Sequence, residues 1–514
     1  MKLKFPIGIQ SFEKIREEGY YYVDKTQFVE KLVKSGTYYF LSRPRRFGKS
    51  LFLDTLRQTF LGKKKLFKGL YLYDNWDWEK KYPVIYISFG AGVHKTKEEL
   101  LETQNIILNE HAKEYGVSLE YRFVKDRFFE LIKALSKKYN SQVVVLIDEY
   151  DKPILDNIED RETAIEMREC LKNFYSVLKD ADSYLKFVFI TGVSKFSKVS
   201  IFSGLNNLKD ITLDPQYATI CGYTQRELEA VFGEVLRDFD LQEIKTWYNG
   251  YNFLGETVYN PFDILLCLDT KMYRPYWFET GTPSFLIKLL YEKKFFIPEL
   301  EGFEASEKIV SSFDVEDIEP EVLLFQTGYL TIKGVKRRGY RQIYRLGYPN
   351  LEVKISFNDY LLDWYTKKGL VAKEKEYDLV YDALERADLE GLRKGFESFF
   401  AGIPHDWYRK TELAGYEGFY ASVVYAYFAA LGVDVRVEEG VNKGRLDMAV
   451  LFNDRCYLFE FKVVELEGEG RALAQIKEKG YYEKYLNQYK EVYLIGVEFS
   501  KEKRNIVAFE WEKL

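Results

Sequence analysis

The sequence predicts an α/β protein with a parallel sheet at the N-terminus, a helical middle region and a smaller α/β domain at the C-terminus. Apolar strands alternate with helical segments up to about residue 221, which is typical of a parallel sheet covered by helices. The pattern is mostly helical from residue 222 to 370. From residue 405 the order is a helix over 415–431, three strands, a helix over 471–485 and two strands. We therefore expect a sheet domain over 1–221, a lid and connecting domain over 222–370, a charged helical linker over 371–404 and a C-terminal domain over 405–514.

The elements of the N-terminal part follow from apolar runs and capping residues. Asp24 or Thr26 is expected to cap a helix over 27–34. Apolar runs predict strands at 38–41, 83–89, 142–147 and 185–191, and the segments between them predict helices at 51–60, 96–139 and 161–180. Polar residues end these strands, and open parallel sheets bind ligands at the carboxyl ends of their strands.

A phosphate-binding pattern follows the first of these strands. Residues 43–50 read Arg-Pro-Arg-Arg-Phe-Gly-Lys-Ser, which fits G-x-x-x-x-G-K-[ST] except for the arginine in place of the first glycine. Backbone N–H groups of such a loop surround phosphates, the lysine reaches the β- and γ-phosphates, and the serine binds Mg²⁺. We expect ATP to be bound by Arg46, Phe47, Gly48, Lys49 and Ser50.

Two acids end the apolar strand that precedes Tyr150. In a phosphate-binding context Asp148 is expected to hold Mg²⁺, and Glu149 to orient and activate the attacking water. The alternative is a strand end with ordinary surface acids. At the end of the next strand Thr191 is expected to contact ATP; Thr191 or Ser194 would sense the γ-phosphate, or simply cap the strand.

A second candidate site lies near the C-terminus. Asp447 follows Gly444-Arg445, and Glu460 and Lys462 lie two residues apart on a predicted strand, so both point to one face while Phe459 and Phe461 point to a core. Asp447 and Glu460 are expected to bind Mg²⁺, and Lys462 to stabilise charge on a phosphodiester. The supporting candidates are Glu417, Gln475 and Tyr481 or Tyr482. The alternative is that this short pattern arises by chance, with Glu417 an ordinary surface acid.

The charge balance excludes a whole-molecule attraction for nucleic acid. The formal net charge is −5, and residues 405–514 contain 16 Lys and Arg against 19 Asp and Glu. Any nucleic-acid contact must therefore use local patches. The candidates are Arg43 with Arg45 and Arg46, Lys63 to Lys65, and Lys336-Arg337-Arg338 with Arg341; for the last two, solvated surface charge is the alternative.

Cysteine usage and hydropathy limit the class of protein. The four cysteines form no CxxC pair, so neither a zinc site nor a disulfide framework is expected, and a reducing cytoplasm is the expected compartment. Only three histidines occur, and no apolar run approaches the length of a membrane span. We expect no membrane association.

The motifs taken together resemble a known family. The chain is similar to the prokaryotic AAA-ATPase-like proteins that carry a C-terminal PD-(D/E)XK nuclease domain, and this resemblance covers nearly its whole length. The matching segments are residues 22–26, 43–50, 146–151, 191–197, 206–208, 247–251 and 259–261, with the Gly-Arg-x-Asp and Glu-x-Lys elements of the C-terminal site.

The resemblance implies an AAA-like P-loop ATPase domain, with ATP at Lys49 and Asp148, and a restriction-endonuclease-like fold at the C-terminus. It implies an enzyme that hydrolyses ATP and cleaves nucleic acid, most simply DNA, with Mg²⁺. Two alternatives stay open: a nucleotide-dependent module that binds nucleic acid or protein without cutting, and an ATPase that acts on a protein complex. No residue determines an oligomeric state, although a homo-oligomer is compatible with this class of ATPase.

Overall fold

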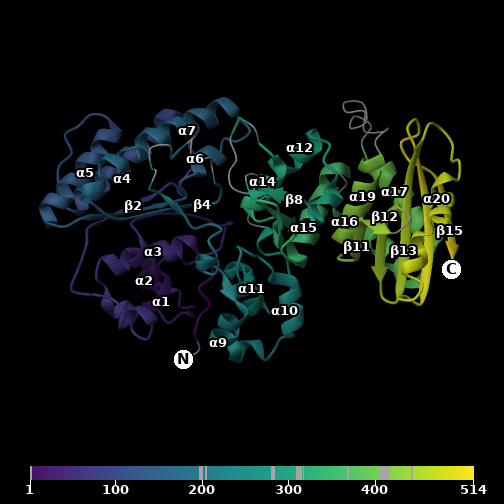
Figure 1. Cartoon of the computed structure of the whole chain (residues 1–514), viewed down its shortest axis with the longest axis horizontal. Helices are drawn as coiled ribbons and strands as arrows, with labels where there is room; N and C mark the ends of the chain where they lie inside the picture. The colour runs from purple at the N-terminus through teal and green to yellow at the C-terminus, as the bar shows by residue number, and fades with distance from the viewer. Residues whose placement is uncertain are drawn as a thin grey trace. The chain divides into compact units, whose positions relative to one another are not determined.

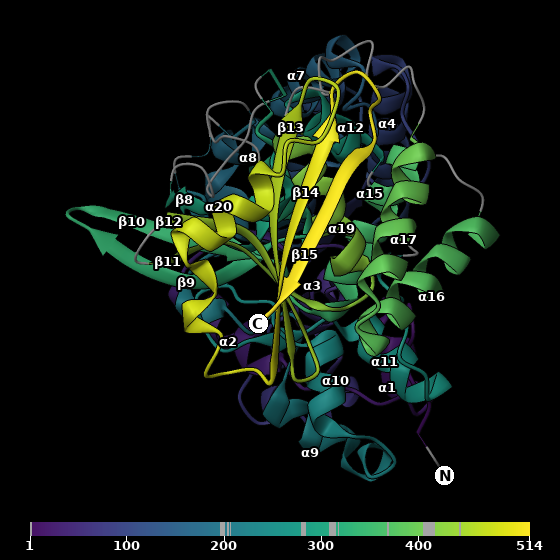
Figure 2. The ribbon, with the colours of Figure 1, turned by 90° about the vertical axis from the view of Figure 1, so that its right-hand side faces the viewer.

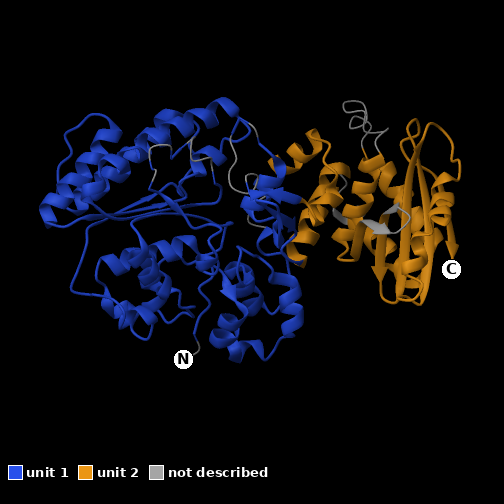
Figure 3. Cartoon of the chain, in the orientation of Figure 1, with its two compact units in different colours: residues 1–281, 304–350 blue, residues 282–303, 351–514 orange. Residues whose placement is uncertain are grey.

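The computed structural model describes residues 3–195, 201–202, 205, 207–278, 284–307, 315–316, 318–366, 370–403, 417–441 and 444–514. The chain folds into two compact units (Figure 3): unit 1 contains residues 1–281 and 304–350, and unit 2 contains residues 282–303 and 351–514. The predicted boundaries at 222, 371 and 405 therefore lie inside these units. The four-part division stays a prediction, because compactness alone does not define functional domains.

Unit 1 is built on a parallel sheet with the strand order β2-β3-β4-β1-β5. Helices cover both faces of this sheet, with α1 to α3 on one side and α4 to α7 on the other (Figure 1). Every residue of β1 and β3 is buried, which explains why these strands are continuous apolar runs without alternation. The strands are β1 (Tyr38–Ser42), β2 (Val84–Ser88), β3 (Val143–Asp148), β4 (Leu185–Gly192) and β5 (Lys209–Asp210).

The helices around this sheet begin close to where the sequence predicts them. Asp24 accepts hydrogen bonds from the backbone and the hydroxyl of Thr26, the first residue of α2. The segment predicted as helical over 96–139 forms two helices. The helices are α1 (Phe12–Glu17), α2 (Thr26–Ser35), α3 (Lys49–Phe60), α4 (Lys97–Glu114), α5 (Val124–Tyr139), α6 (Lys152–Leu155), α7 (Arg161–Tyr175) and α8 (Val177–Asp180), with short 3-10 turns η1 (Lys64–Phe67), η2 (Tyr71–Tyr73), η3 (Asp182–Tyr184) and η4 (Pro215–Tyr217).

The rest of unit 1 is a helical segment followed by a small antiparallel sheet with the order β8-β10-β9. The helical segment has its own core, which includes Leu228, Phe232, Ile244 and Leu268. Its elements are β6 (Tyr223–Thr224), α9 (Gln225–Leu236), α10 (Leu241–Tyr248), β7 (Val258–Tyr259) and α11 (Pro261–Thr270), followed by β8 (Glu304–Ser306), α14 (Pro320–Thr327), β9 (Thr331–Arg338) and β10 (Arg341–Gly347).

Unit 2 contains a five-stranded sheet with the order β11-β12-β13-β14-β15. Its β13–β14 pair is parallel, and its other pairs are antiparallel. Helix α20 packs on one side of this sheet, and α17 and α19 pack on the other (Figure 2). The elements are α12 (Ser284–Glu292), η6 (Ile297–Glu301), α15 (Leu351–Thr366), α16 (Leu370–Arg386), α17 (Leu389–Ala401), α19 (Glu417–Ala430), β11 (Asp434–Val441), β12 (Gly444–Phe452), β13 (Arg455–Val464), α20 (Arg471–Lys479), η8 (Tyr481–Lys484), β14 (Glu491–Ser500) and β15 (Ile506–Lys513).

The predicted order of helix, three strands, helix, two strands is present in unit 2, with one difference in length. The helix expected over 471–485 ends at Lys479, because Gly480 adopts a left-handed backbone with φ 62° and a 3-10 turn follows. The predicted first helix begins at 415, and residues 415 and 416 lie outside the described residues. None of the helices described in the two units is both long enough and apolar enough to span a membrane.

Candidate functional site

The phosphate-binding pattern forms a loop between β1 and α3. Arg46 and Gly48 have left-handed backbone angles, φ 66° and φ 90°, so the loop curls back on itself before α3 begins at Lys49. The Lys49 ammonium is buried inside this curl and donates to the carbonyls of Arg43 and Pro44, at 3.0 and 2.9 Å. The lysine therefore faces the interior of the loop, where a phosphate would lie.

Arg43 has a structural role in this loop. Its side chain is 1% exposed, donates to the carbonyls of Ser42, Thr212 and Tyr217, and stacks on the Phe253 ring at 3.8 Å. This corrects its expected place in a nucleic-acid patch, because a side chain enclosed in this way reaches neither DNA nor a partner. Arg45 and Arg46 are exposed.

Three carboxylates, those of Asp148, Glu149 and Asp151, lie at the end of β3 and just after it. Asp148 is 2% exposed and accepts from the Tyr86 hydroxyl at 3.3 Å. Glu149 has φ 49°, an uncommon conformation for a residue with a side chain, and a Cβ on Gly90 would lie 2.9 Å from its carboxylate. Burial and the neighbouring Asp148 charge raise the pKa of Glu149. Such a group is suited to accept a proton from water.

A cavity of about 360 Å³ connects the loop with this strand end. The P-loop side contributes Arg46, Phe47, Gly48, Lys49 and Ser50, and the strand end contributes Glu149 and Asp151. Further lining residues come from the N-terminal segment and the helical segment of unit 1: Pro6, Gly8, Ile9, Gln10, Tyr223, Pro261, Phe262 and Leu265. The cavity lining therefore combines polar phosphate-binding groups with apolar side chains, a combination suited to a nucleotide.

Thr191 does not line this cavity. It is fully buried, and its hydroxyl donates to the Leu41 carbonyl at 2.8 Å. Val193, two residues further along, lines the cavity instead. Ser194 donates to Asp151 at 2.5 Å. These placements argue against a direct phosphate contact by the Thr191 side chain.

The carboxylates of the C-terminal site are placed by the β12–β13 hairpin. Met448 pairs with Phe459, so Asp447 and Glu460 come next on their strands. The Phe461 backbone N–H donates to Asp447 at 2.8 Å, which holds this carboxylate beside β13. Glu460 is 1% exposed, and its Oε2 atom has no hydrogen-bond partner among the residues that the structure describes.

Helix α20 and helix α19 each add a side chain to these groups. Gln475 on α20 donates to Glu460 Oε1. Lys462 lies 3.1 Å from Glu417 on α19 and 3.6 Å from Glu460. The predicted supporting residues Glu417 and Gln475 are thus in direct contact with the trio. Tyr481 is buried near Glu460 and packs in the core beside α20.

Burial and neighbouring charges shift the pKa values of two groups in this cluster. Burial, together with the nearby Asp447 charge, raises the pKa of Glu460 to about 8. Burial opposes the charge on Lys462, but Glu417 and Glu460 outweigh it and raise the lysine pKa. Buried carboxyl groups with a raised pKa are common at functional sites. A cation bound beside such a group would compensate the negative charge of its ionised form.

The donor set fits a small hard cation. Across the described parts of the chain, no group of three or more His, Cys, Asp and Glu side chains could hold a metal by itself. The site instead offers Asp447 and the unpartnered Oε2 atom of Glu460. Mg²⁺ is commonly held by one or two carboxylates together with waters and substrate phosphates, so two donors are sufficient.

Family models match both the N-terminal and the C-terminal part of the chain. Residues 6–202 match the family described as "Predicted AAA-ATPase", and residues 415–509 match the PD-(D/E)XK nuclease superfamily. A protein of Azotobacter chroococcum mcd 1, "Uncharacterized protein in vnfD 5'region", is 52% identical over 512 residues and covers 99% of each chain. The chain belongs to the family of AAA-ATPase-like proteins with a C-terminal PD-(D/E)XK nuclease domain.

In this AAA-ATPase-like protein, the structure adds residues that the sequence did not single out. Asp151 is fully enclosed, lines the cavity and accepts from the backbone and hydroxyl of Ser194, which ties the β3 end to the β4 end. In the sequence Asp151 belongs to the family-like segment 146–151, but nothing there assigned it a role. The N-terminal segment 6–10 carried no signal of its own.

In the PD-(D/E)XK domain, Glu498 is the residue that sequence reasoning missed. It is 1% exposed and accepts from the backbone N–H groups of Glu469, Gly470, Arg471 and Ala472, at the start of α20. Gly496 precedes it on β14, and a Cβ there would lie 2.3 Å from the Leu473 backbone. Both residues bring α20 close enough to the sheet for Gln475 to reach Glu460.

Parts of the family motifs lie outside the described residues. These are residues 196 and 197 of the segment 191–197, and residue 206.

Proposed function

We propose that this protein is an ATPase joined to a metal-dependent DNA nuclease, and that its nucleotide state regulates cleavage. The observation that carries the proposal is the convergence of Asp447, Glu460 and Lys462 at one end of the β12–β13 hairpin. Asp447 lies 13 positions before Glu460 and on the facing strand of the hairpin, so a chance pattern in the sequence has no reason to bring its carboxylate to Glu460 and Lys462.

Each side chain of the C-terminal site would have its own role in phosphodiester cleavage. Asp447 and Glu460 would hold a divalent cation, which supplies Lewis-acid stabilisation and an activated water when bound. Lys462 is half-buried and charged, so its ammonium would donate to a non-bridging oxygen as negative charge develops there. Gln475 keeps one oxygen of Glu460 occupied and leaves Oε2 free for ligation.

The nucleotide half of the proposal rests on the P-loop cavity. Lys49 would exchange its two carbonyl contacts for phosphate oxygens, which are far stronger partners for an ammonium. Ser50 and Asp148 would hold Mg²⁺, and Glu149 would accept a proton from the attacking water. Burial lowers the pKa of Lys49, and the nearby Asp148 charge opposes this shift. An incoming triphosphate would therefore stabilise the charged lysine.

The first experiment is a cleavage assay on plasmid and single-stranded DNA with Mg²⁺, with and without ATP. Wild type should cleave in an ATP-sensitive manner, and Asp447→Ala should not cleave. Lys462→Ala should also lose cleavage while it keeps ATP binding. Cleavage by Lys462→Ala at the wild-type rate would refute the assignment of the nuclease site.

A second candidate function is a nucleotide-dependent binding module whose nuclease fold does not cut. Two observations favour it: residues 405–514 carry a net −3, and the pKa of Glu460 near 8 leaves it protonated at neutral pH in the absence of a cation. Absence of cleavage of DNA and RNA with Mg²⁺ or Mn²⁺, together with intact ATP binding, would favour this module.

A further inference from the structure

The β9–β10 hairpin of unit 1 concentrates positive charge in an otherwise acidic chain. Residues 331–347 contain six Lys and Arg and no Asp or Glu, although the whole chain has a net charge of −5. In Figure 2 the two long strands extend away from the neighbouring elements as a ribbon. The two strands are joined at their tip by Gly339 and Tyr340.

Strand register places most of this charge on one face. Arg338 pairs with Arg341, Lys336 with Ile343, and Gly334 with Arg345. Directly opposed residues and every second residue along a strand share a face. Lys336, Arg338, Arg341 and Arg345 therefore lie together, and Arg337 lies on the opposite face. We name these four residues the basic face.

One carboxylate partly balances the basic face. Glu304 on β8 is paired with Arg345, and it contacts the side chain of Lys336 and, at 3.4 Å, that of Arg338. The pKa of Glu304 is lowered, chiefly by its bond to Lys336. Among the residues that the structure describes, four cations and one carboxylate leave a net charge of about +3 on this surface. The Arg338 side chain remains 66% exposed, so it can contact a ligand although it is paired with Glu304.

Protection of a sheet edge does not account for this arrangement. Lysines on an edge strand prevent unwanted pairing with other strands, and β9 is such an edge. However, Arg341 and Arg345 belong to β10, the central strand of the β8-β10-β9 sheet. Its charges therefore need another explanation.

The tip of the hairpin carries an aromatic ring between two arginines. Tyr340 is fully exposed, at 101% of its reference area, and it lies two residues from Arg338 and next to Arg341. Because its ring is not buried, packing within the chain does not explain why a tyrosine occupies this position. Flanked by cations, such a ring is suited to contact a sugar or base edge while the arginines bind phosphates.

We propose that the basic face of the β9–β10 hairpin, with Tyr340 at its tip, binds the phosphate backbone of duplex DNA. The choice of DNA as the ligand rests on the proposed function. The basic face would give a nuclease domain with a net charge of −3 a separate surface for its polyanionic substrate. The binding is expected to be independent of sequence and strongly dependent on salt.

The test measures binding of the full chain to a fluorescein-labelled duplex by anisotropy, with EDTA present so that no cleavage occurs. The triple variant Lys336→Gln, Arg338→Gln, Arg341→Gln should bind at least about tenfold more weakly at low salt. Because each lost phosphate contact lowers the salt slope by about 1, the slope of log affinity against log salt should fall by about 3. Melting temperatures should not change, because the replaced side chains are exposed.

A matched control removes the same charge elsewhere in unit 1. Lys113→Gln, Lys125→Gln, Lys137→Gln replaces three exposed lysines on α4 and α5. This variant should bind with about the wild-type affinity and slope. For the tip, Tyr340→Ala should weaken binding about fivefold, whereas Tyr121→Ala, at another exposed tyrosine of unit 1, should not.

Three results would overturn the inference: equal binding by the two triple variants, absence of duplex binding by wild type, or competition by polyglutamate as effective as that by DNA. The last result would indicate an acidic protein partner. Failure of the nuclease proposal looks different. In that case no cleavage would occur with Mg²⁺, while duplex binding would still depend on the basic face.

Discussion

At the scale of single residues, the ionisation of Glu460 connects folding to function. Its carboxyl is enclosed beside Asp447, which raises its pKa from an ordinary 4.5 to about 8. Unfolding exposes this carboxyl, which then ionises near pH 4.5. The unfolded state therefore binds fewer protons between these two values, and the stability of the cation-free protein falls as pH rises from about 5 to 8.

Glu460→Gln should remove this penalty. We expect the cation-free variant to be more stable than wild type at pH 8 by on the order of 2 kcal/mol and nearly equal to it at pH 5. Mg²⁺ should raise the melting temperature of wild type at pH 8 but not that of the variant. Thermal unfolding at both pH values, with and without Mg²⁺, measures both effects. A variant that is less stable at pH 8 would contradict the assigned protonation state.

At the scale of elements, Glu498 links the start of α20 to the sheet. It accepts four backbone N–H groups that a helix start otherwise leaves unsatisfied. Glu498→Gln should lower the free energy of unfolding by about 2 kcal/mol. It should also lower kcat for DNA cleavage with little change in DNA affinity, because Gln475 loses its position against Glu460. Glu467→Gln, an exposed acid in the same loop, is the control and should change neither quantity.

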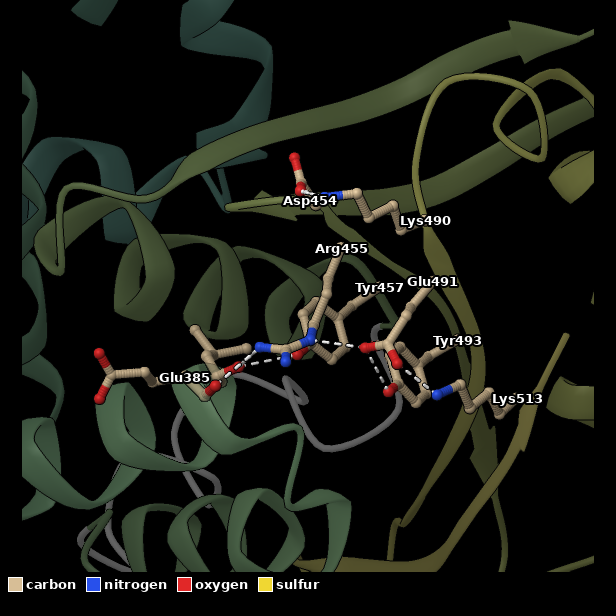
Figure 4. Close-up of polar contacts among 9 residues, drawn as sticks. Glu385, Asp454, Arg455, Tyr457, Lys490, Glu491, Tyr493 and Lys513 are labelled. Atoms are coloured by element: carbon tan, nitrogen blue, oxygen red, sulfur yellow. Dashed lines mark hydrogen bonds and ion pairs between the residues drawn. The ribbon is translucent and has the colours of Figure 1, made fainter.

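A second element-scale contact joins α16 to the sheet of unit 2. Arg455 on β13 bridges Glu491 at 2.6 Å and the Glu385 carbonyl at 2.7 Å, and Glu491 also binds Lys513 (Figure 4). These bonds to Lys513 and Arg455 lower the pKa of Glu491 to about 2. Tyr457 adds a bond to the Leu384 carbonyl. The C-terminal end of α16 is therefore held by side chains of the sheet.

Arg455→Met should lower the melting temperature by about 2 °C, because it removes contacts to both the carboxylate and the helix end. Lys490→Met is the control, since its pair with Asp454 is 80% and 67% exposed and stands apart in Figure 4. The control should leave the melting temperature unchanged. Equal effects of the two substitutions would show that the bond to α16 does not contribute to stability.

At the scale of the whole molecule, the proposed regulation requires that the nucleotide state alters cleavage. Glu149→Gln should bind ATP and lose at least about a hundredfold of its hydrolysis, whereas Lys49→Ala should lose ATP binding. The two variants therefore hold the protein in opposite nucleotide states. Their DNA cleavage rates with ATP should differ from each other severalfold. Identical rates would rule out regulation and leave two independent activities in one chain.

The sequence by itself predicted four of the five strands of the parallel sheet, the order of elements in the C-terminal domain and the candidate residues of both sites. Continuous apolar runs predict strands covered on both faces, and the alternation of Glu460 and Lys462 with two phenylalanines correctly predicts which residues share a face. Only the tertiary structure decided which polar groups are free to act. Arg43 and Thr191 are satisfied by carbonyls of distant strands and loops. Glu498 acts on a helix start some 27 residues earlier in the chain. Local patterns reveal which face a residue is on, whereas its hydrogen-bond partners depend on long-range packing.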